Sequence, residues 1–123
     1  MALSRAAAIG SAAERAVVAF LLAEGCEILG TNVRVGHLEL DVVARWGGTV
    51  LVVEVRSRGN TSWTSAFGSL DAKKRARVRM AGERLWDRAF KRDPSVVHLR
   101  FDSASVTFDE NGRAHVEYAA AAF

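Results

Sequence analysis

Apolar residues recur along the chain at two spacings, one typical of helices and one typical of strands. Between residues 5 and 24 they recur every three or four positions, which predicts a helix, and Gly25 follows as its left-handed C-terminal cap. The helical spacing returns after Ser69, the expected N-cap of a second helix that runs to about residue 91. Pro94 lies just beyond that point and prevents the helix from continuing. The pattern therefore predicts two helices.

Strands are predicted in the segments between and after these helices. They are expected at residues 26–35, 37–45, 50–58, 96–108 and 113–118. A strand, a helix of about 20 residues and another strand form a crossover unit, so the third and fourth strands should be parallel. The sequence predicts a single α/β domain over residues 1–123. Its mixed sheet of four to five strands is flanked by helices, in the order α-β-β-β-α-β-β.

The hairpin LELDVVARWGGTVLVVEVRSR, residues 38–58, carries acids inside strands that are otherwise apolar. If its two adjacent glycines form a two-residue turn, the numbers of facing residues sum to 95. Asp41 then faces Glu54, and Glu39 faces Arg56. Alternation along the first strand also predicts two sets of side chains on opposite faces. One set is Leu38, Leu40 and Val42, and the other is Glu39, Asp41 and Val43.

Two carboxylates that face each other are destabilising unless a proton or a cation lies between them. Oxygen ligands in this arrangement suit Mg²⁺ or Mn²⁺, with water and phosphate oxygens completing the coordination. The acids share their face with Val43, Val50 and Val52, so this face is not fully solvated. We therefore predict a divalent metal site at Asp41 and Glu54. The alternative is a pair of solvated acids without a ligand.

Charge is distributed unevenly along the chain. The net charge is +3, yet residues 70–92 contain nine Lys or Arg and three acids, a balance of +6 that leaves −3 elsewhere. Cations near a helix N-terminus are disfavoured by the helix dipole, so the run KKRARVR favours contact with phosphate. The candidate DNA-binding residues are Lys73, Lys74, Arg77 and Arg58. A merely solubilising face is the alternative.

Composition limits the location of the protein. The single cysteine, Cys26, excludes an internal disulfide framework and suits a reducing compartment. The alanine-rich start of the chain is interrupted by Glu14 and Arg15, so it does not form the apolar core of a signal peptide. No apolar run is long enough to span a membrane. A cytoplasmic protein without membrane contact is expected.

Several short motifs, taken together and in order, resemble a known family. They are GSAAE ending at residue 14, ELD at 39–41, VEVRSR at 53–58, FGSLDAKK at 67–74, RFD at 100–102 and HVEYAAAAF at 115–123. The chain resembles the YraN-like family of small bacterial proteins, which is similar to the PD-(D/E)xK nuclease superfamily and its Holliday-junction resolvases. This resemblance implies a restriction-endonuclease-like core that hydrolyses phosphodiester bonds in DNA, including branched DNA. By analogy with the resolvases, it also suggests a homodimer.

The resemblance also implies roles for individual residues. Asp41 and Glu54 match the metal-binding acids, and the backbone carbonyl of Val55 would be a further ligand. Glu14 and Glu39 match acids that help to position metal or water. All five positions lie in the motifs quoted above. With these ligands, the family resemblance implies a centre that binds Mg²⁺ or Mn²⁺.

Two positions depart from the family pattern. Leu38 replaces the usual glycine, and Arg56 replaces the lysine that orients or helps to deprotonate the attacking water. Arginine can hold the scissile phosphate, but it stays protonated and cannot serve as a base. Three functions therefore remain open. They are a metal-dependent nuclease, a nucleic-acid-binding module with little or no catalysis, and a structural or interaction protein.

Overall fold

Five strands form one sheet, in which their order is the same as in the chain. The computed structural model describes residues 11–57 and 68–123, including side chains from residue 72 onward in the second segment. The elements are α1 (Ala12–Ala23), β1 (Glu27–Val35), β2 (Leu38–Trp46), β3 (Thr49–Ser57), α2 (Gly68–Leu85), β4 (His98–Phe108) and β5 (Ala114–Ala119). Strands β3 and β4 are parallel, and all other neighbours are antiparallel. The predicted mixed α/β fold is confirmed.

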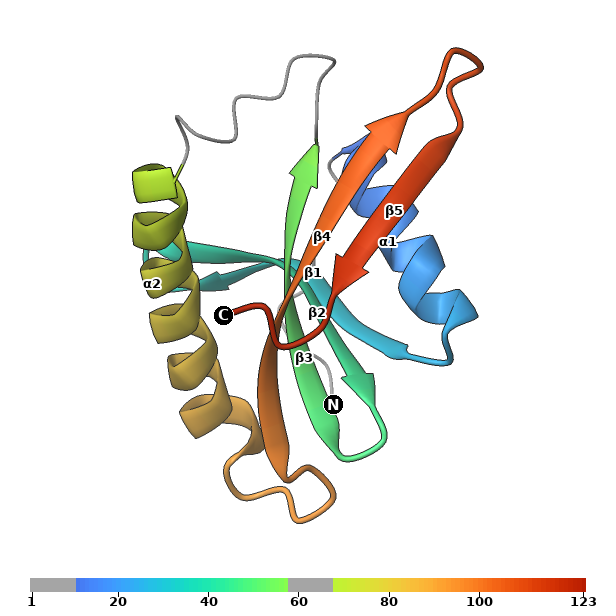
Figure 1. The fold of residues 1–123 in the computed structure, drawn as a ribbon. Coiled ribbons are helices and arrows are strands. Elements are labelled where there is room, and N and C mark those ends of the chain that lie inside the picture. Colours follow the sequence, from blue (N-terminus) through green and yellow to red (C-terminus); the bar gives the residue numbers. More distant parts are fainter. Residues whose placement is uncertain (1–10, 58–67) are drawn as a thin grey trace.

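The sheet is covered by one helix on each face (Figure 1). Helix α2 packs Val78, Ala81 and Leu85 on one face, where they join valines of β1, β2 and β3 in a buried cluster. On the other face α1 contacts all five strands, with Val17 and Leu21 fully buried. Each face thus has its own apolar core, which fixes the sheet between the helices.

The ends of the helices follow from local sequence, with one difference from expectation. Ser11 caps α1 by accepting a hydrogen bond from the Glu14 backbone N–H at 3.0 Å, and Gly25 follows with φ +89°, as predicted. Helix α2 begins at Gly68, so the prediction of Ser69 as its N-cap is wrong. After Leu85 the chain continues through a π-helical turn, η1 (Trp86–Phe90), before Pro94.

The register of the β2–β3 hairpin agrees with the sequence as far as its ladder extends. Facing residues run from Trp46 and Thr49 to Val42 and Val53, and each pair sums to 95. The ladder ends there, so β2 and β3 separate beyond Val42. The predicted pairings of Asp41 with Glu54 and of Glu39 with Arg56 are therefore wrong, because both lie beyond the end of this ladder. On its other side, Glu39 lies opposite Arg34 of β1.

Strand β2 changes the face it presents at Asp41. Leu40 lies in the core under α2, whereas Val42 lies in the core under α1. The predicted common face for Leu38, Leu40 and Val42 is therefore wrong. The change coincides with Asn32 of β1, which has φ +50° and lies opposite Asp41 in the β1–β2 register. A left-handed residue interrupts the regular alternation of a strand.

The C-terminal segment is held by a buried carboxylate on β4. Asp102 accepts two hydrogen bonds from Arg100, at 2.8 and 2.9 Å, one from the Tyr118 hydroxyl, and one from the Ala121 backbone N–H at 2.9 Å. Beyond these hydrogen bonds, the ring of Phe123 packs against the ring of Phe101 in the core under α2, and the two ring centroids are 5.4 Å apart. Asp102 thus joins the end of the chain to the sheet.

Candidate metal and nucleic-acid site

The candidate site lies where β2 separates from β3. If the hairpin continued in the same register, Val55 would exchange backbone hydrogen bonds with Leu40. Instead, the Val55 N–H donates to Oδ2 of Asp41 at 2.9 Å. The N–H and C=O of a strand residue point to the same side, so the Val55 carbonyl also faces this gap. The strands thus place one carboxylate and one backbone carbonyl together.

Glu54 presents a second carboxylate from β3, and it is buried without hydrogen bonds. Its side chain is 0% exposed, and neither Oε1 nor Oε2 has a hydrogen-bond partner among the described residues. Arg56 approaches it as an ion pair, with Nε 3.4 Å from Oε1. A buried carboxylate with this little compensation is costly, and most buried polar groups are hydrogen-bonded. This arrangement fits a group that binds an external cation.

The electrostatics of Asp41 show which other groups lie close to it. The pKa of Asp41 is raised, and burial of the carboxyl group is the largest cause. The charges of Glu14 and Glu54 also raise this pKa. The hydrogen bond from the Val55 N–H and the charge of Lys74 lower it, but by less. The charges that act on Asp41, itself on β2, thus come from three other elements, α1, β3 and α2. Together with Asp41, these groups are three carboxylates and one ammonium group.

Glu14 is held near the site by a residue that the sequence analysis missed. The side-chain amide of Asn32 donates to Oε1 of Glu14 at 3.4 Å. Asn32 is also the residue opposite Asp41, so it lies between the helix acid and the strand acid. An asparagine in the middle of an apolar strand was the available signal, because asparagine tolerates left-handed backbone better than most residues.

The donors present fit a hard divalent cation. Asp41, Glu54 and the Val55 carbonyl offer oxygen ligands, which Mg²⁺ and Mn²⁺ prefer. Within residues 11–57 and 68–123, no three or more His, Cys, Asp or Glu side chains lie together in a group that could hold a metal ion. Mg²⁺ is commonly held by one or two carboxylates, with water and phosphate as the remaining ligands. The described donors match that kind of site.

The basic residues lie on α2, whose N-terminal end is at the same end of the molecule as the C-terminal end of β3 (Figure 1). Lys73, Lys74 and Arg77 are all exposed. Arg58 lies outside the described residues. Helix α2 covers the face of the sheet that carries Val50 and Val52, and Glu54 follows them on this face along β3.

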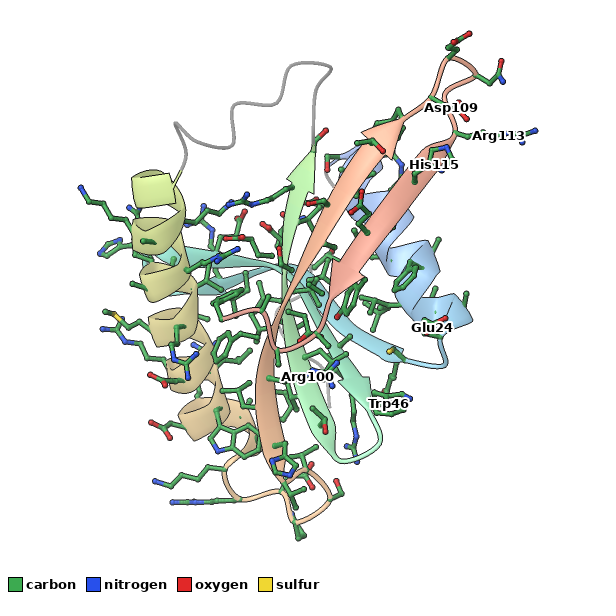
Figure 2. All side chains as sticks on the ribbon, viewed as in Figure 1. Glu24, Trp46, Arg100, Asp109, Arg113 and His115 are labelled. Carbon is green, nitrogen blue, oxygen red and sulfur yellow. The ribbon has the colours of Figure 1, made fainter. Side chains whose placement is uncertain are left out.

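A separate pocket of about 310 Å³ lies on the α1 side of the sheet. Figure 2 shows three of its lining residues, Glu24, Trp46 and Arg100, toward the turn between β2 and β3. Cys26 also lines the pocket, but burial raises the pKa of its thiol and so disfavours the reactive thiolate. Since Arg100 is already bonded to Asp102, the pocket shows no chemistry comparable to the carboxylate site.

The family of the chain follows from comparison with known proteins. A model of the family described as Uncharacterised protein family UPF0102 matches residues 13–106. The chain belongs to this family. The matched region includes Glu14, Asp41 and Glu54, together with the basic part of α2, and it confirms the YraN-like resemblance at the level of the family.

Relatives extend along most of the chain. A UPF0102 protein of Sorangium cellulosum is 56% identical over 116 residues, which cover 94% of this chain and 81% of the relative. One from Bacteroides thetaiotaomicron is 35% identical over 115 residues, covering 94% and 91%. One from a Parafrankia species is 33% identical over 115 residues, covering 94% and 95%. No helix in the described part of this UPF0102 chain is long and apolar enough to cross a membrane.

Proposed function

We propose that this UPF0102 protein is a metal-dependent endonuclease that hydrolyses phosphodiester bonds in DNA. The observation that carries the proposal is the Glu54 carboxylate, fully buried and without hydrogen bonds in the described structure, on the strand next to Asp41. The basic surface of α2 supports a polyanionic substrate. The proposal includes branched DNA as a substrate.

Asp41, Glu54 and the Val55 carbonyl would hold Mg²⁺ or Mn²⁺ in this function. The bound metal would polarise a phosphate oxygen and make water easier to deprotonate. Glu14, oriented by Asn32, would accept a hydrogen bond from the attacking water. Glu39 is exposed, and the buried Leu40 separates it from Asp41 along β2. Its role would therefore be confined to the solvent-exposed edge of the site. Arg56 would balance the charge of Glu54 and bind phosphate.

A second function, DNA binding without cleavage, is favoured by Arg56. Its guanidinium is held by Glu54 and cannot accept a proton from water at neutral pH. The basic helix would bind DNA in either case. Cleavage therefore separates the two functions, and metal binding separates both of them from a structural protein.

The test compares wild type, Asp41→Ala and Glu54→Gln on branched and linear DNA with Mg²⁺ or Mn²⁺. We expect cleavage by wild type to fall by at least about 100-fold in both variants, because each loses a metal ligand. Glu27→Gln, an exposed change on β1, is the matched control and should retain activity. Equal cleavage by all four proteins would indicate a contaminating nuclease and refute the proposal.

Arg56→Lys tests whether the altered position limits the reaction. A compact ammonium group shifts its pKa readily when buried, so it can assist the attacking water in a way that guanidinium cannot. We expect this variant to keep its DNA affinity and to cleave faster than wild type. Cleavage that stays at background in both proteins, with DNA binding intact, would favour the binding module.

A further inference from the structure

Helix α2 directs one of its lysines toward the carboxylate site. Val78, Ala81 and Leu85 define the face of α2 that packs on the sheet. Residues four apart lie on the same side of a helix, so Lys74 continues this face one turn before Val78. Lys73, which is displaced by about 100° around the axis, points away from it. Lys74 is nevertheless exposed, and beyond Val52 the face of β3 under α2 carries the charged residues Glu54 and Arg56 instead of valines.

The level of Lys74 along the sheet follows from the contact of Gly82 with β3. A Cβ atom at Gly82 would lie 3.4 Å from Val52, so these two positions are side by side. Helix α2 runs antiparallel to β3, since it is the crossover between parallel strands. The eight residues back to Lys74 span about 12 Å of helix, which equals about three to four residues of strand. Lys74 therefore lies at the level of Val55 and Arg56.

This level is where Asp41 meets β3. The Asp41 carboxylate is bonded to the Val55 N–H, and Glu54 is the preceding residue. The charge of Lys74 lowers the pKa of Asp41, which agrees with an ammonium group close to the carboxylates. Arg56, the other cation at this level, is engaged by Glu54. Lys74 thus brings a positive charge to the acids from the opposite wall of the site.

We propose that Lys74 is a catalytic residue of the candidate site, whose ammonium group contacts the scissile phosphate at the gap between β2 and β3. The proposal rests on the nuclease function above and gives Lys74 a different role from the general backbone contacts of Lys73 and Arg77. During hydrolysis a water oxygen forms a bond to phosphorus, and the bond from phosphorus to the leaving sugar oxygen breaks. The water proton passes to solvent, and a second water protonates the leaving oxygen. Lys74 keeps its proton and stabilises the charge on the phosphoryl oxygens.

Lys74→Met and the matched control Lys91→Met test this role by two measurements, for which we expect changes of opposite sign: tighter metal binding and slower cleavage. Without DNA, Lys74 repels a metal at Asp41 and Glu54. Lys74→Met should therefore bind Mn²⁺ about three- to tenfold more tightly in titration calorimetry. With saturating DNA and metal, its single-turnover cleavage should be about 100-fold slower. Lys91→Met should leave both values near those of wild type, because Lys91 is exposed beyond η1 and belongs neither to the carboxylate site nor to the proposed DNA contacts. Lys74→Arg should restore the wild-type metal affinity.

The outcomes separate this proposal from the function on which it rests. If wild type binds Mn²⁺ through Asp41 and Glu54, but the two methionine variants behave alike, Lys74 has no special role and this proposal alone is overturned. If wild type neither binds Mn²⁺ nor cleaves DNA, both the nuclease function and this proposal are overturned. Thermal unfolding of both variants checks that these exposed substitutions leave the fold intact.

Discussion

Two buried carboxylates, Asp102 and Glu54, have opposite surroundings although they lie on neighbouring strands. Asp102 accepts hydrogen bonds from Arg100, Tyr118 and the Ala121 backbone, so its charge is well compensated. Glu54 has an ion pair with Arg56 and no hydrogen bond among the described residues. Burial alone therefore does not define a binding site. The distinguishing feature of Glu54 is that its oxygens remain available in the interior.

This contrast predicts different costs of neutralising the two acids. Asp102→Asn should destabilise the protein by about 2–4 kcal/mol, because it weakens several bonds and leaves Arg100 without its counter-charge. Glu54→Gln should change the stability of the metal-free protein much less. Urea denaturation without divalent metal measures both, and exposed Glu110→Gln is the control. Equal losses for Asp102→Asn and Glu54→Gln would show that Glu54 is as fully compensated as Asp102.

The raised pKa of Asp41 predicts how stability depends on pH. Burial and the charges of Glu14 and Glu54 make the folded state bind the Asp41 proton more tightly than the unfolded state does. Its contribution to stability is therefore most favourable below the unfolded pKa of 3.8 and is lost as the pH rises through the higher folded pKa. Asp41→Asn should raise the unfolding temperature at pH 7 without metal.

Added Mn²⁺ should reverse this order. It should stabilise wild type by binding to the folded state, and it should have little effect on Asp41→Asn. Thermal unfolding at pH 4 and pH 7, with and without Mn²⁺, gives the difference in unfolding temperature between the two proteins under each of these four conditions. A wild-type protein that is more stable than Asp41→Asn at neutral pH without metal would contradict the predicted sign.

Helix α2 depends on a close approach to β4 at Gly82. An added Cβ would lie 2.5 Å from Cε1 and 2.7 Å from Cζ of Phe101. Gly82→Ala should therefore destabilise the protein by about 1–3 kcal/mol through overpacking, although alanine favours the helix by about 1 kcal/mol. In a Phe101→Leu background the clash is removed and Gly82→Ala should become neutral or stabilising. A double-mutant cycle by urea denaturation measures this coupling, and additive effects would contradict it.

The sequence predicted the elements better than it predicted the faces of β2. Hydrophobic spacing, Gly25 and the glycine turn located both helices and the hairpin, because these signals are local. The change of face at Asp41 coincides with the left-handed backbone of Asn32 in the neighbouring strand, and no pattern within β2 indicates it. The sequence singled out Asp41 and Glu54, but the ladder ends at Val42 and Val53, so the predicted pairing that led to them is not formed. Their link to Glu14 through Asn32 was not foreseen, since that contact joins α1 to β1.

The surface of the protein combines a basic helix with a more acidic remainder. Residues 70–92 carry a balance of +6 and the other residues −3. Lys73→Ala with Arg77→Ala should weaken DNA binding and lower the slope of log affinity against log salt by about one unit per lost phosphate contact. Arg113→Ala, an exposed change at the turn between β4 and β5, is the control (Figure 2). An unchanged slope would mean that α2 is only a solvated face.

The parallel pairing of β3 with β4 also has a consequence for the order of folding. Strands β1, β2 and β3 are joined by short turns, whereas β3 and β4 are separated by α2 and about 40 residues. Contacts close in sequence form first, so we expect an early intermediate that contains the three-stranded meander and lacks β4. All three acids, Glu14, Asp41 and Glu54, belong to this N-terminal part, and Lys74 joins them only with the crossover. During refolding, stopped-flow binding of Mn²⁺ should therefore precede the fluorescence change that reports the packing of Trp86, in η1, against the core on the α2 face.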